Sequence, residues 1–153
     1  PEMQGGLVKT LDFKIYLGLL SETYNDAHAA DLKRVDGVAI DMVVVNLYPF
    51  EETVADPDVT PERARANIDI GGPCMVRAAA KNFLRVASVT DPNIYGRILN
   101  ELRGANGSIG LQTRFELAKK AFMHTAEYDA AITSYLAGKE FKEIKNCYIT
   151  EEH

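Results

Sequence analysis

The sequence is poor in the residues that build metal centres and disulfide frameworks. It has only two cysteines, Cys74 and Cys147, and three histidines among 153 residues. Neither residue type shows the close spacing of a metal-binding motif. We therefore interpret each cysteine as a free thiol and expect no metal site and no disulfide, a pattern typical of a reducing cytoplasm.

The sequence also lacks an excess of positive charge and any long apolar run. It has 17 Lys and Arg against 22 Asp and Glu, a net charge of -5, so we expect neither a nucleic-acid partner nor an anionic membrane surface. No run approaches the roughly 20 apolar residues of a membrane span, and no signal peptide is recognisable. Because Pro1 stands where an initiator methionine would, we expect a processed part of a longer protein.

What remains is the composition of an ordinary globular domain, with 46% apolar and 25% charged residues. The strongest strand pattern is VAIDMVVVNLYPF, residues 38–50. Its nearly continuous apolar, β-branched character predicts a central parallel strand that is covered on both faces and ended by Pro49. A second, shorter strand is predicted at residues 85–92.

Helices are predicted between and after these strands, which indicates an α/β layered domain. Residues 1–20 predict a loop followed by a short helix or strand, and Thr60 with Pro61 has the pattern of a helix start. The longest helix, residues 111–136, ends at Gly138 and carries one apolar stripe of Leu117, Ala121, Tyr128, Ile132 and Leu136. The other predicted elements are helices at 23–34, 51–56, 60–68, 73–82 and 93–103 and a terminal strand at 146–152.

The stretch NIDIGGPCMVRAAAKN, residues 67–82, has two interpretations. In the first, Asp69 ends one helix, Gly71 and Gly72 turn the chain, and Pro73 begins the next helix. In the second, the glycines let a ligand approach the backbone, and the N–H groups of the helix N-terminus bind an oxyanion. The glycine pair matches no nucleotide-binding fingerprint.

Arg77 and Lys81 lie four residues apart, on one helical face. They form either a solvated cationic face near the helix C-terminus, or a face whose lysine, Lys81, is aimed back at a ligand site. Because three alanines precede Lys81, we predict a closely packed helix with a partly buried Lys81, whose pKa burial would alter.

Asn46 and Tyr48 follow the predicted central strand directly. Ligands of open α/β sheets bind beyond the carboxyl ends of the strands, so both side chains stand where polar groups serve function. Tyr48 is equally consistent with a rim aromatic whose hydroxyl is hydrogen-bonded. Lys9, in a glycine-flanked segment, has the pattern of an exposed loop lysine.

Four blocks, VKTL, VVVNLYPFEETVA, NIDIGGPCMVRAAAKN and KKAFMHTAEYDAAITSYL, resemble the IMP cyclohydrolase domain of the bifunctional purine-biosynthesis proteins in order and spacing. The other half of these proteins is the AICAR formyltransferase. The resemblance implies a three-layer α/β fold with a mostly parallel sheet, like that of methylglyoxal synthase. It also implies a cytoplasmic enzyme that closes the purine ring of formylated AICAR, a purine ribotide, to inosine monophosphate without metal or organic cofactor.

The resemblance also implies a set of site residues. Its catalytic positions fall on Lys9, Tyr48, Asp69 and Lys81. Its substrate-binding positions fall on Thr10, Asn46, Ile70, Gly71 and Gly72. The possible partners that it implies are a second copy of the chain and a fused or separate formyltransferase domain.

The sequence departs from the family pattern in LVKTLDFKIYLG, residues 7–18. Leu7 replaces an arginine, Phe13 a proline, and Asp12 and Tyr16 replace histidines. These changes keep a second hypothesis open: a non-catalytic module that binds a nucleotide or phosphate, or a degenerate paralogue. We expect residues 1–138 to form a partial cyclohydrolase-like domain and residues 139–153 to be a C-terminal extension or the start of a linker.

Overall fold

The computed structural model of the chain describes residues 11–145 and 147, and these fall into two compact units. The first, called the sheet unit, comprises residues 1–47 and 70–125. The second, called the helical unit, comprises residues 48–69 and 126–153. The terminal strand predicted at residues 146–152 lies outside the described residues, apart from Cys147, which is in a turn.

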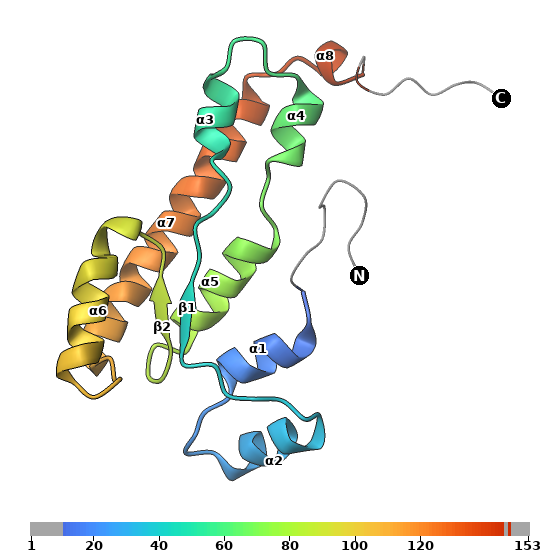
Figure 1. Cartoon of the computed structure of the whole chain (residues 1–153). Coiled ribbons are helices and arrows are strands. Elements are labelled where there is room, and N and C mark those ends of the chain that lie inside the picture. The colour runs from blue at the N-terminus through green and yellow to red at the C-terminus, as the bar shows by residue number, and fades with distance from the viewer. Residues whose placement is uncertain (1–10, 146, 148–153) are drawn as a thin grey trace. The chain divides into compact units, whose positions relative to one another are not determined.

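The sheet unit contains two parallel strands, β1 (Met42–Val44) and β2 (Ala87–Val89), which lie side by side (Figure 1). Val43 pairs with Ser88 in the centre of the register. The prediction of parallel pairing is confirmed, but the strands are shorter than predicted. Within the described residues the sheet has only these two strands, and Val44 is 52% exposed. The prediction of a central strand covered on both faces is therefore wrong.

Helices pack on both faces of the sheet because successive side chains of a strand point to opposite sides. One face of β2 packs on α6 (Tyr95–Gly104) and on α7 (Leu111–Ala137), which begins in the sheet unit. The other face adjoins α5 (Gly71–Lys81), whose Val76 carbonyl accepts the Ser88 hydroxyl at 3.2 Å. The core of the first face comprises Ala87, Val89, Ile98, Ile109 and Leu117, and that of the second Leu19, Val43, Ala78, Ala79 and Val86.

The short element that the sequence predicts within residues 1–20, as either a helix or a strand, is a helix. Helix α1 (Phe13–Leu20) begins after Asp12, whose carboxylate accepts the Lys14 N–H at 2.8 Å. It is followed by α2 (Asp26–Arg34), with Asn25 as its N-cap. The short 3₁₀ helix η1 (Pro92–Ile94) leads directly into α6.

The C-terminal end of α1 is held by two polar side chains that come from beyond α5. The Arg85 guanidinium donates to the carbonyls of Gly18 and Ser21, and the Asn82 amide donates to those of Leu19 and Ser21. Helix ends leave carbonyls without intrahelical partners. These contacts therefore supply hydrogen bonds to carbonyls at the end of α1.

The helical unit contains α3 (Phe50–Ala55), α4 (Pro61–Ala66), the second part of α7 and α8 (Phe141–Lys145). The predicted start of α4 is confirmed, because the Thr60 hydroxyl accepts the Arg63 N–H at 3.2 Å. Its core is aromatic: the Phe50 ring meets Tyr128 and Tyr135 edge-on, with centroids 6.2 and 5.9 Å away.

The predicted apolar stripe of α7 is only partly confirmed. Leu117, Ala121 and Tyr128 are buried, whereas Leu136 is 53% exposed. The helix ends at Ala137, as Gly138 predicts. In the part of the chain that the structure describes, no helix combines the length and the apolar character of a membrane span.

Candidate functional site

The two glycines of the Gly-Gly-Pro sequence lie inside a helix. Helix α5 begins at Gly71, so Gly71 and Gly72 form its first turn and Pro73 is its third residue. The Cys74 N–H donates to the Ile70 carbonyl at 3.3 Å, the first hydrogen bond of this helix. The helix predicted at residues 73–82 is confirmed, but it begins two residues earlier, so the glycines do not form a separate turn before it. The stretch Ile70–Gly72 instead places backbone amides and the positive end of the helix dipole at one point, an arrangement that suits an anion.

Lys81 and Arg77 occupy the exposed face of α5. The close packing predicted from the alanines is confirmed, since Ala78, Ala79 and Ala80 are buried. The predicted partial burial of Lys81 is wrong, because its side chain is exposed. At 100° per residue, Lys81 returns to the face of Arg77, whose guanidinium lies 5.4 Å from the centre of the Phe122 ring.

Asn46 and Tyr48 follow β1, as predicted, but they belong to different units. The Asn46 side-chain oxygen accepts the Tyr95 hydroxyl at 3.1 Å, within the sheet unit. Tyr48 begins the helical unit, where its side chain is 37% exposed and its carbonyl accepts the Phe50 N–H at 2.8 Å. The phenol of Tyr48 is thus accessible to a ligand.

Asp69 ends the first segment of the helical unit and is tied to α7. Its backbone N–H donates to the Tyr128 hydroxyl at 2.9 Å, and this hydroxyl donates to the Asn67 carbonyl at 3.0 Å. Burial raises the pKa of the Tyr128 phenol, the Asp69 N–H lowers it, and electrostatic interactions with Asp69, Asp129 and Tyr48 raise it. The Tyr128 hydroxyl therefore contacts the backbone of Asp69 directly.

The hydrogen bonds of Tyr128 are not predicted by the sequence pattern. Its position in the α7 stripe predicted a core side chain, and it is only 8% exposed. A buried tyrosine hydroxyl nevertheless needs a hydrogen-bond partner. The need for a partner indicates that this hydroxyl is hydrogen-bonded. It does not identify the partners, which lie about 60 residues away in the sequence.

The structure groups the predicted site residues by unit. Tyr48 and Asp69 belong to the helical unit, and Lys9 and Thr10 lie outside the described residues. The sheet unit holds the other members of the set, which are Asn46, Ile70, Gly71, Gly72 and Lys81.

Two of the departures from the family pattern lie in or next to α1. The Asp12 carboxylate caps the helix. The Tyr16 hydroxyl is buried without a hydrogen-bond partner among the described residues, and burial, followed by the influence of Cys74, raises its pKa. Leu7 lies outside the described residues.

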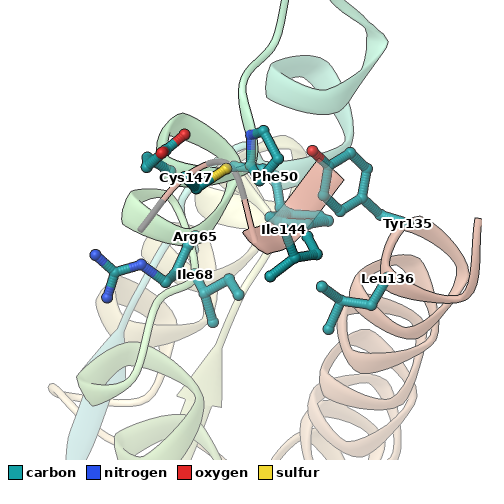
Figure 2. Close-up of a pocket in the computed structure, with 10 residues that line it drawn as sticks. Phe50, Arg65, Ile68, Tyr135, Leu136, Ile144 and Cys147 are labelled. Atoms are coloured by element: carbon teal, nitrogen blue, oxygen red, sulfur yellow. The ribbon is translucent and has the colours of Figure 1, made fainter. Parts of the chain in front are cut away.

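The helical unit also contains an apolar pocket of about 260 Å³ (Figure 2). Side chains of four helices line it, including Phe50 of α3, Arg65 of α4, Tyr135 of α7 and Ile144 of α8. None of the described site residues predicted from the sequence lines it. In the ranges 11–145 and 147, no group of three or more His, Cys, Asp or Glu side chains is placed to hold a metal ion.

Comparison with known proteins gives matches over most of the chain. The family model for the AICARFT/IMPCHase bienzyme matches residues 79–153. The bifunctional purine biosynthesis protein PurH of Synechococcus sp. (strain WH7803) is 52% identical over 139 residues, which are 91% of this chain and 26% of that protein. PurH of Prochlorococcus marinus (strain MIT 9211) is 47% identical over 152 residues, 99% of this chain and 29% of that protein.

The chain thus spans between a quarter and a third of the length of these two relatives. Among solved structures, the crystal structure of ForH matches with a TM-score of 0.80 at 32% identity. The match covers 92% of this chain and 72% of the ForH chain. At this identity and TM-score, the likeness extends to sequence as well as fold.

Proposed function

Because the chain belongs to the AICARFT/IMPCHase bienzyme family, we propose that it carries the IMP cyclohydrolase activity of purine biosynthesis. The observation that carries the proposal is the 52% identity to a PurH protein across 139 residues. We also propose that it has a three-layer fold like that of methylglyoxal synthase. We further propose that it is cytoplasmic, that it forms a homodimer, and that a formyltransferase domain is its fused or separate partner.

The proposed reaction closes a six-membered ring within one substrate molecule. The carboxamide nitrogen of formylated AICAR forms a bond to the formyl carbon and gives up a proton, while the formyl oxygen takes up negative charge. That oxygen is protonated to a hydroxyl and leaves as water, and a ring nitrogen loses the second proton as the C=N bond forms. Because both reacting groups belong to one molecule, folding it into an attack geometry supplies part of the acceleration.

Four side chains receive chemical roles in this proposal. Asp69 is the base that takes the amide proton. Lys9, Lys81 and the Tyr48 hydroxyl stabilise the developing oxyanion and return a proton to it. Loss of one such donor typically costs about 3 to 4 kcal/mol of activation free energy.

The remaining site residues bind the purine ribotide. The backbone of Ile70, Gly71 and Gly72, at the start of α5, suits an anionic or carbonyl group of the substrate. Asn46, with its carbonyl oxygen paired to Tyr95, offers its amide N–H₂ as a donor, and Thr10 offers a hydroxyl. No metal and no organic cofactor takes part.

Substitution of Asp69 by Asn tests the proposed base. We expect Asp69→Asn to lower kcat for ring closure by roughly 10²- to 10⁴-fold, because the amide cannot accept the proton. The matched control is Asp58→Asn, at an exposed position of the same unit. The readout is the absorbance change on formation of inosine monophosphate, and turnover by Asp69→Asn at the Asp58→Asn level would exclude Asp69 as the base.

The alternative of a non-catalytic binding module gives a different result in the same experiment. Such a module would bind inosine monophosphate and gain thermal stability from it, but the unsubstituted chain would not close the ring. A degenerate paralogue would show neither turnover nor a ligand-dependent rise in Tm.

A further inference from the structure

One hydroxyl joins the segment that carries Asp69 to the long helix α7. The Tyr128 oxygen accepts the Asp69 N–H at 2.9 Å and donates its own hydrogen to the Asn67 carbonyl at 3.0 Å. A phenol can act as donor and acceptor at once. Tyr128 therefore bridges two backbone groups that lie two residues apart, and it does so within the helical unit.

The segment that is bridged is a connection rather than a helix or strand. Helix α4 ends at Ala66 and α5 begins at Gly71, so Asp69 lies between them. The N–H groups of Asn67 and Ile68 bond back to Ala64 and Arg65 at the end of α4. Connecting segments move more readily than the elements they join. The Tyr128 hydroxyl therefore fixes the backbone at Asp69, beyond the reach of the α4 hydrogen bonds.

The Tyr128 ring is itself well held. It is 8% exposed and packs edge-on against Phe50, which is 1% exposed. The Phe50 N–H in turn donates to the Tyr48 carbonyl. The same aromatic contact thus connects the two segments that carry Tyr48 and Asp69, the two described members of the proposed catalytic set in this unit.

The protonation state of the phenol suits this role. Burial raises its pKa, electrostatic interactions with Asp69, Asp129 and Tyr48 raise it further, and the hydrogen bond from the Asp69 N–H lowers it. The hydroxyl consequently keeps its proton at neutral pH and can donate to Asn67.

From this geometry we infer that Tyr128 is a positioning residue for ring closure, which holds the Asp69 backbone so that the carboxylate of Asp69 meets the amide proton. The inference rests on the proposed function. Tyr128 acts through Asp69 and makes no contact with substrate. Loss of its hydroxyl should therefore affect the chemical step more than substrate binding.

The test compares two tyrosine-to-phenylalanine variants on the same helix. Tyr128→Phe removes the bridging hydroxyl and keeps the ring. Tyr135→Phe is the matched control, because Tyr135 also packs edge-on against Phe50 and its hydroxyl has no hydrogen-bond partner among the described residues. We expect Tyr128→Phe to lower kcat about 10- to 100-fold with KM within about twofold, since small displacements of a reacting group cost up to 10²-fold. Tyr135→Phe should retain both constants.

A second measurement does not depend on activity. Amide hydrogen exchange followed by NMR should show faster exchange at Asp69 in Tyr128→Phe and an unchanged rate in Tyr135→Phe, because only the first loses the acceptor of this N–H. An unchanged kcat in Tyr128→Phe, or an unchanged Asp69 exchange rate, would overturn the inference. A lack of ring closure by the unsubstituted chain would instead refute the proposed function, and the exchange rates would still decide whether Tyr128 holds Asp69.

Discussion

Tyr16 shows how a single hydroxyl limits stability. Its oxygen is buried in the sheet unit without a hydrogen-bond partner among the described residues. A buried polar group without a partner costs about 1 to 3 kcal/mol. We therefore expect Tyr16→Phe to raise the free energy of unfolding by about 1 kcal/mol at neutral pH, measured by urea denaturation. A loss of stability would show that the hydroxyl has a partner in the folded chain.

The same phenol makes stability depend on alkaline pH. Burial raises the pKa of Tyr16 above its ordinary value of 10.0, so the folded state holds the phenol proton more tightly than the unfolded state. The resulting stabilisation is complete below the unfolded pKa and is lost as the pH rises through the folded pKa. Tyr16→Phe should lose less stability above pH 10 than the unsubstituted chain. Tyr128, whose pKa is also raised, retains part of the effect.

Local sequence patterns did not predict the environment of the proposed site residues. The exposed position of Lys81 follows from helical geometry, but the alanines before it suggested burial. The three alanines are buried, but the next residue of the helix, Lys81, is exposed. The Tyr128–Asp69 hydrogen bond joins residues 59 apart in sequence. No periodicity or spacing encodes such a pairing.

At the scale of elements, α1 lies unusually close to the strand-entry segment at residue 38. A side chain on Gly18 would overlap the Val38 carbonyl oxygen and would come within 3.1 Å of the Ile40 side chain. The Ile40 N–H also donates to the Gly18 carbonyl at 3.0 Å. The absence of a side chain at Gly18 is therefore what allows the helix to approach this backbone.

We expect Gly18→Ala to lower the free energy of unfolding by about 1 to 3 kcal/mol, because the overlapping atom belongs to backbone and α1 must shift. The matched control is Gly96→Ala in α6, where an added side chain would meet no atom within 4 Å. There alanine should stabilise the helix by about 0.5 to 1 kcal/mol. Equal effects of the two substitutions in urea denaturation would contradict the close approach at Gly18.

Sequence patterns located most elements but not all of their ends. The cap at Thr60 and the stop at Gly138 act locally, so the helix ends that depend on them were predicted from the sequence. The extent of β1 depends on pairing with β2, which covers only three residues of each strand, and its β-branched run could not predict that limit. Helix α5 starts two residues earlier than its proline suggests, at glycines of low helix propensity.

At the scale of the whole molecule, the two units differ in how much apolar core holds them. Among the described residues, the buried apolar side chains of the helical unit are Phe50, Ala64 and Tyr128, whereas the sheet unit contains the three larger clusters of buried residues. Regions with few buried apolar contacts open at lower free energy than the global transition. Amides of α3 and α4 should therefore exchange faster than those of α5 in native-state hydrogen exchange.

Phe50 is the side chain on which this difference can be tested. It is 1% exposed, contacts two tyrosine rings and lines the pocket of the helical unit. Phe50→Ala should cost about 3 to 5 kcal/mol of local stability, and α3 and α4 should lose protection while α5 keeps it. Val89→Ala, which truncates a buried side chain that packs with Ile98 of α6 in the sheet unit, should lower protection in β2 and α6 instead. If both variants reduced protection uniformly along the chain, the units would unfold as one cooperative body, and the small core of the helical unit would not determine its opening.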